Sequence, residues 1–263
     1  MHTADGELRW RSENPEVEVF DREGKQIRKI PLVSPSPLSQ KGAVLRALLP
    51  ERGEYFLVIE ETRRDFGLHL AEKRGSTKAK ATLVKSLLRL VDLKGRKIWE
   101  REMPDKTLIG DAGSPQSLSI SNKGTVAILL QDVDPYSHNR PILSVFNPSG
   151  SEVLRLDYTA WTRIDGFALS GDGKTLSVLG FGLIPEDGEI GSALGYYDIA
   201  QGKPLWIKAA PHDLKSAKTF RMVDPEGWAC CVKKGAAYSS FSRAGEIKLL
   251  SPDEMFRRFG VSP

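Results

Sequence analysis

The polar side chains between residues 132 and 139 come closest to a recognisable chemical pattern in this sequence. The stretch "DVDPYSHN" places oxygen atoms at close spacing, on Asp132, Asp134, Ser137 and Asn139. This spacing is loosely that of a calcium-binding loop, but the glycine at the sixth position and the glutamate at the twelfth are absent. Polar turn chemistry explains the pattern better, so we predict no metal site.

Histidine supplies no metal motif either. The chain has four histidines without an HxxxH or CxxC pattern: His2, His69, His138 and His212. His138 or His212 would form a general acid and base if it met an aspartate such as Asp111 or Asp187 in the folded chain. Nothing in the spacing requires such a pair. We therefore predict no catalytic residue, and enzymatic activity is not favoured.

The two cysteines, Cys230 and Cys231, are adjacent, which excludes a long-range disulfide framework. They either close a strained ring or alternate along one strand, and we favour alternation. The glycines of "GFGLIPEDG" follow a strand into another loop, without the helix N-terminus that would hold a phosphate, and no GxSxG elbow is present. The sequence thus predicts no cofactor.

A cluster of basic residues stands out in a chain whose net charge is only +4, with a pI near 9.0. Its members lie in "EKRGSTKAKATLVK": Lys73, Arg74, Lys78, Lys80 and Lys85. A solvated loop explains the cluster, and the alternative is a binding site for anions or acidic partners. The lysines are not interleaved with aromatic residues, and the net charge is modest, so nucleic-acid binding is not favoured.

Glycine-closed turns organise the elements that would position these residues. Nine glycines separate runs of β-branched, aromatic and aliphatic residues: Gly24, Gly53, Gly95, Gly124, Gly150, Gly173, Gly202, Gly227 and Gly245. Three residues before seven of the nine lies Asp, Asn or Ser, which predicts a type I turn closed by a left-handed glycine. The turns in "PERG" and "DIAQG" depart from this rule, so we expect them to be built differently.

The predicted hairpins alternate between two kinds. An apolar inner hairpin such as "LSISNKGTVAILL" precedes a more charged outer one such as "LSVFNPSGSEVLRL". One of each makes a four-stranded antiparallel blade, so the predicted fold class is all-β, a single β-propeller domain over residues 1–263 with four to five blades. We expect a partial blade at 8–32, whole blades at about 43–104, 117–158, 165–208 and 220–250, and a short helix at 251–259. Ser251 as N-cap and Glu254 would form a capping box for that helix.

The partial first blade leaves the closure of the ring open. The segment "GELRWRSENP" would supply one further strand, and a strand from the C-terminal end would complete a fifth blade. An open array that closes through dimerisation and a chain that has lost blades are the alternatives. The sequence therefore does not decide between a monomer and a dimer.

The hairpins resemble those of known propellers. "LSGDGKTLSVLG" resembles the inner hairpin of WD40-like propellers, whereas "DLKGRKIWERE" and "DIAQGKPLWIK" are similar to the outer hairpins of quinoprotein-like propellers, where a docking tryptophan follows a glycine turn. The resemblance implies that Trp99 and Trp206 pack between neighbouring blades. Quinone-dependent dehydrogenases have more blades and a calcium-held cofactor, which this short chain is not expected to share.

The long connections point to a binding face. In a four-stranded meander the second turn and the link to the next blade emerge at the edge opposite the glycine turns, so the long connections should share one face. They are residues 31–43, 61–86, 104–117, 132–141, 181–192 and 209–219. Insertions gathered on one face of a repeat protein usually form its binding surface.

We therefore predict a non-catalytic module that binds a protein or peptide through the long-loop face. The candidate binding residues are Lys73, Arg74, Lys78, Lys80, Asp132, Asp134, His138 and Asp187. The alternative is an enzyme or a sensor of a small molecule or carbohydrate that uses the central channel. No apolar run is long enough to span a membrane and no signal peptide is seen, which predicts a soluble protein but leaves its compartment open.

Overall fold

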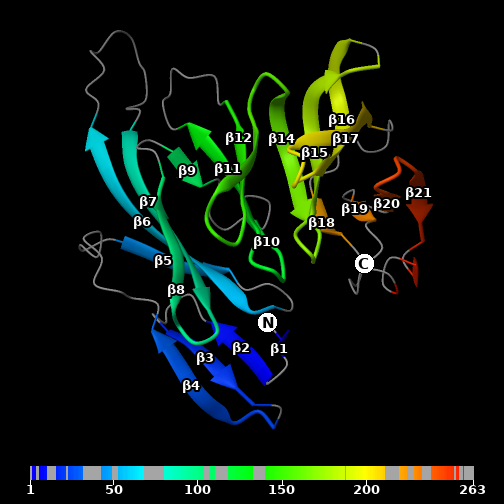
Figure 1. The fold of residues 1–263 in the computed structure, drawn as a ribbon. Helices are drawn as coiled ribbons and strands as arrows, with labels where there is room; N and C mark the ends of the chain where they lie inside the picture. The colour runs from blue at the N-terminus through cyan, green and yellow to red at the C-terminus, as the bar shows by residue number, and fades with distance from the viewer. Residues whose placement is uncertain are drawn as a thin grey trace. The chain divides into compact units, whose positions relative to one another are not determined.

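The structure is a computed structural model of the 263-residue chain. It describes residues 2–3, 6–10, 16–21, 23–31, 43–48, 53–67, 80–103, 107–109, 118–132, 140–186, 188–210, 219–223, 228–232, 238–251, 253–254 and 257. Strands dominate this part of the chain (Figure 1). No helix within the described ranges has the length and apolar character needed to cross a membrane.

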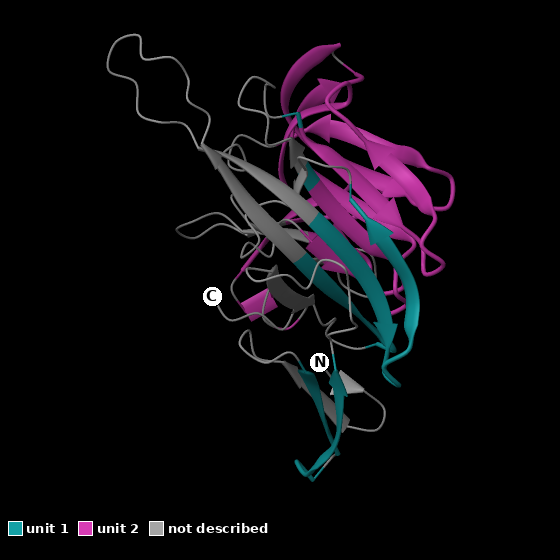
Figure 2. Cartoon of the chain, turned by 90° about the vertical axis from the view of Figure 1, so that its left-hand side faces the viewer, with its two compact units in different colours: residues 1–109, 130–140 teal, residues 110–129, 141–263 magenta. Residues whose placement is uncertain are grey.

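The chain forms two compact units, which Figure 2 colours separately. Residues 1–109 and 130–140 make up unit 1. Its first sheet contains β1 (His2–Thr3), β2 (Gly6–Trp10), β3 (Glu16–Phe20) and β4 (Gln26–Pro31), and its second contains β5 (Ala43–Leu48), β6 (Tyr55–Gly67), β7 (Lys80–Asp92) and β8 (Lys97–Glu102). A short strand, β9 (Thr107–Ile109), pairs with the end of β11, from Leu130 to Asp132.

Unit 2 comprises residues 110–129 and 141–263 and contributes three further sheets. The first consists of β10 (Leu118–Ile120), β11 (Val126–Asp132), β12 (Ile142–Phe146) and β13 (Glu152–Leu156). The second consists of β14 (Trp161–Leu169), β15 (Thr175–Ile184), β16 (Glu189–Asp198) and β17 (Lys203–Ala209). The third consists of β18 (Thr219–Val223), β19 (Ala229–Val232), β20 (Tyr238–Phe241) and β21 (Ile247–Leu250). Apart from β9, which pairs with β11, the strands of every sheet follow chain order, so each sheet contains a four-stranded meander of the kind that forms a propeller blade.

The predicted glycine turns are confirmed wherever the structure describes them. In six turns the glycine amide donates to the carbonyl three residues earlier at 2.9–3.1 Å, and the glycine φ is between 72° and 84°. These turns begin at Asp21, Asp92, Ser121, Asn147, Ser170 and Ser242. Each first side chain also accepts hydrogen bonds from the turn; Asn147 Oδ1, for example, accepts from the amides of Ser149 and Ser151 at 3.1 and 2.9 Å. The turn at Asp224 lies outside the described residues.

The two departures from the turn rule are also confirmed. Gly53 has a φ of 158°, unlike the left-handed glycines of the six regular turns. In "DIAQG" the amide of Gly202 donates to the carbonyl of Ile199 at 3.3 Å, while Asp198 Oδ1 accepts from the amide of Gln201 at 3.1 Å. Asp198, one residue earlier than in the regular turns, therefore stabilises this turn through a hydrogen bond from the amide of Gln201.

The first sheet extends beyond the partial blade expected at 8–32, and the division of the chain into blades stays a prediction. The N-terminal segment supplies two strands, β1 and β2, so the sheet reaches four strands without a contribution from the C-terminal end. β1 pairs through only two residues, His2 and Thr3. A strand of this length is too short to show the alternation of apolar and polar residues by which strands are predicted from sequence. At the other end of the chain, the predicted capping box is confirmed: Glu254 N donates to Ser251 Oγ at 3.2 Å, and Ser251 N donates to Glu254 Oε2 at 2.9 Å.

Apolar clusters join neighbouring sheets within each unit. In unit 1 the side chains of Val17, Val19 and Ile30 pack against those of Phe56, Val58 and Val91, which come from the second sheet. In unit 2 one cluster joins β11–β13 to β14–β16, and another joins β14–β17 to the sheet that carries Ala229 and Phe241. Within each unit, neighbouring sheets are thus stabilised by the burial of apolar side chains against one another.

Trp206 confirms the predicted packing of a tryptophan between sheets. Its ring centroid lies 5.8 Å from that of Tyr196 on its own sheet and 5.7 Å from that of Phe241 on the following sheet. Its Nε1–H donates to the carbonyl of Arg243 at 2.9 Å. Trp99, at the matching position of β8, is also buried.

The same contact recurs in unit 1 with a different residue. Arg28 occupies the position equivalent to Trp206, four residues after the turn glycine, and its Nη2 donates to the carbonyl of Leu93. Leu93 and Arg243 are both the second residue of the next outer turn. This position therefore ties one outer hairpin to the following turn, and an arginine or a tryptophan can make the contact.

Candidate functional site

Most of the predicted binding residues lie outside the part of the chain that the structure describes. Lys73, Arg74, Lys78, Asp134, His138 and Asp187 belong to this group, so their role stays a prediction. Only the backbone is described for Lys80, which pairs with Gly67, and for Asp132, which pairs with Thr107. Within the described residues no group of three or more His, Cys, Asp or Glu side chains is arranged to hold a metal ion.

Three of the expected loops are partly strands, and one of them, 104–117, contains β9. In the basic stretch, β6 continues to Gly67 and β7 begins at Lys80, so residues 61–67 and 80–86 form a ladder. In the same way, β15 runs to Ile184 and β16 begins at Glu189, within the connection expected at 181–192. Asp132 likewise ends β11. The strands of both hairpins are longer than expected. Their outer residues are charged or glycine-rich and were therefore interpreted as loop, although each pairs with the neighbouring strand.

The cysteines occupy the strand positions expected of them. Cys230 and Cys231 are successive residues of β19, paired with Ser240 and Ser239 of β20.

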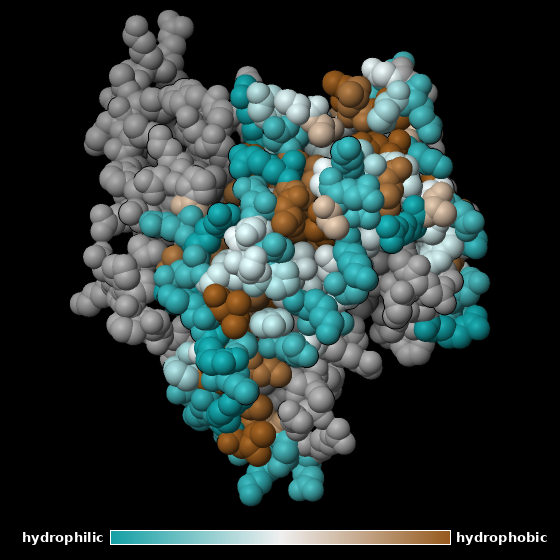
Figure 3. Space-filling view, in the orientation of Figure 1, coloured by the Kyte–Doolittle hydropathy of each residue, from teal (hydrophilic) through white to brown (hydrophobic). Residues whose placement is uncertain are grey.

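Exposed apolar side chains concentrate at one end of the sheet β14–β17. Among the described residues eight large hydrophobic side chains are exposed. Four lie singly on outermost strands, namely Ile27, Ile98, Leu205 and Ile247. The other four lie on the β15–β16 hairpin or in the turn that leads into β14: Tyr158, Phe181, Leu183 and Ile190, with 45%, 37%, 43% and 58% of their surface exposed. Figure 3 shows hydrophobic side chains on this end of the hairpin beside hydrophilic ones.

The register of β15 and β16 places three of these side chains together. Leu183 is the direct cross-strand partner of Ile190, and Phe181 lies two positions earlier on the same face of β15. The turn carrying Tyr158 lies beside them, because the amide of Leu183 donates to the carbonyl of Ala160 at 3.2 Å. We call Phe181, Leu183 and Ile190, together with Tyr158, the apolar hairpin end.

The opposite face of the hairpin is anchored by a buried aromatic pair. Trp161 and Tyr197 have 0% and 2% of their surface exposed, and Trp161 Nε1–H donates to the Tyr197 hydroxyl at 2.7 Å. Burial raises the pKa of Tyr197 to about 12, although the hydrogen bond from Trp161 acts in the other direction. Gly195 leaves space for this pair, since a Cβ there would lie 2.8 Å from the Trp161 ring. The base of the hairpin is therefore rigid, while its other face meets solvent.

Charged groups border the apolar hairpin end unevenly. Arg163 lies over the Phe181 ring, 5.8 Å from its centroid, and pairs with Asp165 at 2.8 Å. Glu186 and Glu189, at the tip, are exposed. No lysine or arginine occurs between Lys174 and Lys203, so the hairpin itself carries only negative charge.

The turn into β14 is held by its own side chains. Hydrogen bonds from the Thr159 hydroxyl and amide lower the pKa of Asp157 below its usual range. The carboxylate therefore stays ionised and keeps the turn beside Leu183 well ordered.

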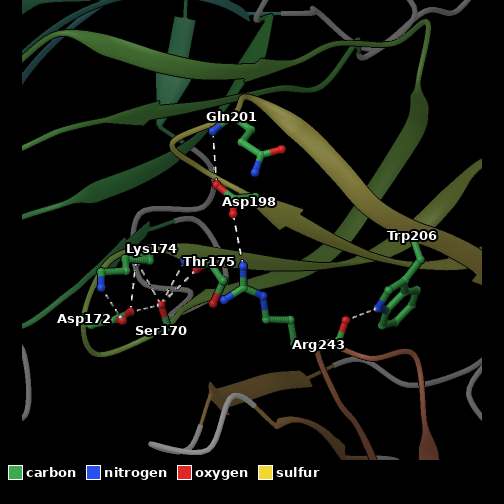
Figure 4. A network of polar contacts seen from close by, with 8 residues as sticks. All are labelled: Ser170, Asp172, Lys174, Thr175, Asp198, Gln201, Trp206 and Arg243. Carbon is green, nitrogen blue, oxygen red and sulfur yellow. Dashed lines mark hydrogen bonds and ion pairs between the residues drawn. The ribbon is translucent and has the colours of Figure 1, made fainter.

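The opposite end of the same sheet is polar and satisfied internally (Figure 4). Ser170 Oγ donates to Asp172 at 2.7 Å and accepts from the amide of Thr175 at 3.0 Å. Asp198 pairs with Arg243 of the next sheet at 3.1 Å. These contacts serve the turns and the junction between sheets, so the apolar hairpin end is the better candidate for contact with another molecule.

Sequence reasoning missed Phe181, Leu183 and Ile190 as site residues. The signal was the alternation of glycine with large side chains in "GFGL", residues 180–183, which is typical of a strand with one open face. The interpretation of 181–192 as a loop concealed it.

Successive four-stranded antiparallel meanders are the architecture of a β-propeller type of repeat protein. No family model and no curated protein matches the sequence. Its fold is similar to the crystal structure of HIRA(644-1017), with 13% identity and a TM-score of 0.42 over 78% of this chain and 55% of that one. It is also similar to the β-propeller domain of the Trilobed protease from Pyrococcus furiosus, with 12% identity and a TM-score of 0.43 over 80% and 58%.

A third similar structure is the complex of KlAtg21 with the coiled-coil of AgAtg16, with 12% identity and a TM-score of 0.45 over 95% of this chain and 68% of that one. The chain spans little more than half the length of the HIRA fragment. At these identities the likeness concerns the fold alone.

Proposed function

We propose that this protein is a non-catalytic binding module that holds a protein or peptide partner against the apolar hairpin end. The observation that carries the proposal is the gathering of Tyr158, Phe181, Leu183 and Ile190, half of the exposed large apolar side chains in the described residues, at one end of one sheet. Such a patch costs free energy in water unless another surface covers it.

The position of the patch supports the same proposal. The β15–β16 turn and the turn into β14 emerge from the same edge of their sheet, which is the edge of the long connections. Side chains held on a rigid hairpin lose little conformational entropy when a partner binds. The buried pair of Trp161 and Tyr197 provides that rigidity.

Affinity capture with matched variants tests the proposal. The intact chain is immobilised and exposed to extract from its native cells, beside a Leu183→Asp, Ile190→Asp variant. A control variant with Ile27→Asp and Leu205→Asp carries the same new charge on side chains that are 54% and 38% exposed on outermost strands.

We expect a protein that is retained by the intact chain and by the control but lost from the hairpin variant, because a carboxylate in the contact would be buried without a partner. Retention by all three proteins would contradict the proposed surface. Absence of any retained protein would favour the alternative, a small-molecule or carbohydrate ligand in the central channel. Deletion of residues 70–82 in a fourth chain tests whether the basic residues Lys73, Arg74 and Lys78 take part.

A further inference from the structure

We infer that the partner segment recognised by the apolar hairpin end is a peptide that combines large apolar side chains with flanking lysine or arginine. This inference rests on the proposed function and specifies the chemistry of the partner. The evidence is the charge distribution around the apolar side chains.

Glu186 and Glu189 differ from most of the other described carboxylates of unit 2. Most of those that the structure describes lie within 4.0 Å of a basic group: Glu152 with Arg155, Asp165 with Arg163, Asp172 with Lys174, Asp198 with Arg243 and Glu246 with Lys248. Glu186, in the turn after β15, and Glu189, the first residue of β16, form no ion pair with any described residue; Glu189 pairs with Ile184, so it lies at the hairpin tip on the face opposite to Leu183 and Ile190. Among the described residues, no basic group therefore compensates the negative charge at the tip of the hairpin.

Arg163, the cation that the described residues place at the patch, does not offset this charge. Arg163 is held by Asp165 at 2.8 Å and its guanidinium lies over the Phe181 ring. It thus extends the apolar floor of the patch while its charge is neutralised locally. A partner meets apolar surface bordered by carboxylates, which favours cationic groups next to apolar anchors and disfavours polyanions such as nucleic acid or an anionic membrane.

Selection of peptides tests the inference directly. A phage library of random peptides of about 12 residues is selected on the intact protein, and the peptide recovered most often is synthesised with a fluorescent label. Its affinity is measured for the intact chain, for Glu186→Gln with Glu189→Gln, and for Leu183→Asp with Ile190→Asp. Glu246→Lys, a charge change at the residue just before β21, is the control, and the thermal midpoint of each variant establishes that it is folded.

We expect recovered sequences rich in Leu, Phe or Trp beside Lys or Arg. Two exposed charge contacts should make the Glu→Gln variant bind about 2- to 30-fold more weakly, with the difference shrinking as salt rises from about 0.02 M to about 0.5 M. The Glu246→Lys control should bind as the intact chain does.

The other outcomes separate this inference from the proposed function. Peptides that need Leu183 and Ile190 but carry no excess of basic residues, and that bind the Glu→Gln variant equally well, overturn the inference alone. If no recovered peptide depends on Leu183 and Ile190, the proposed function fails with it. A dimer of the free chain in light scattering that Leu183→Asp abolishes would identify a second copy as the occupant and would also refute the inference.

Discussion

Replacement of Tyr197 by phenylalanine tests the rigid base beneath the apolar hairpin end. The substitution keeps the ring but removes the hydroxyl that accepts the Trp161 Nε1–H bond of 2.7 Å. Both side chains are almost fully buried, so the indole N–H is left without its acceptor. An unsatisfied buried donor costs about 1–3 kcal/mol. For a chain of this size that loss lowers the thermal midpoint by about 2–10 °C.

The pH dependence gives a second, independent measure of the same side chain. The pKa of Tyr197 is raised from 10.0 to about 12, so its folded state holds the proton more tightly than the unfolded state does. The resulting stability is fully present below about pH 10 and is lost as pH rises through about 12. A shift of this size corresponds to about 3 kcal/mol when the loss is complete, and to about 1 kcal/mol at about pH 11.

Urea unfolding of the intact chain and of Tyr197→Phe at about pH 8 and about pH 11 measures both effects. The variant should be less stable than the intact chain at the lower pH. At the higher pH the difference should shrink by about 1 kcal/mol, because only the intact chain has a tyrosine at position 197, which ionises more readily when the chain is unfolded than when it is folded. Tyr158→Phe, on a side chain that is 45% exposed, is the control. A stability difference between Tyr197→Phe and the intact chain that is the same at both pH values would refute this reasoning.

Three further predictions concern the binding surface, the junction between sheets and a turn. Leu183→Ala with Ile190→Ala should weaken binding of the labelled peptide about 10- to 100-fold, as measured by fluorescence anisotropy. Full burial of each side chain would contribute about 1.5–3 kcal/mol, but only the part that is exposed in the free protein becomes buried when the peptide binds. Trp206→Phe loses the bond to the Arg243 carbonyl and should lower the unfolding free energy in urea by about 0.5–1.5 kcal/mol, whereas an unchanged value would exclude that bond as a tie between sheets. Burial raises the pKa of Asp92, but the hydrogen bonds that Asp92 accepts in its turn outweigh burial and lower the pKa overall. In urea unfolding, the intact chain should therefore be more stable than Asp92→Asn near neutral pH, and this advantage should disappear as the pH falls below about 4. An advantage that stays constant with pH would contradict this prediction.

The sequence by itself determined the repeating unit of this protein. Six turns from Asp21 to Gly245 were predictable because a type I turn closed by a left-handed glycine depends on residues within four positions of one another. The alternation of inner and outer hairpins follows from those turns, and so does the capping box of Ser251 and Glu254. Local hydrogen bonds depend on residues that are close together in the sequence, so they can be predicted from short segments.

Tertiary structure decided the features that depend on distant neighbours. β1 is too short to show a pattern and exists because β2 pairs with it, while the outer half of the β15–β16 hairpin is a strand because Phe181–Ile184 pair with Glu189–Ser192 and Trp161 lies against Gly182. The exposure of Leu183 and Ile190 could not be read from "FGLIPEDGEIGS", since the same apolar residues would be core if another element covered them. Burial is a property of the folded neighbourhood, and for that reason the candidate site emerged only with the fold.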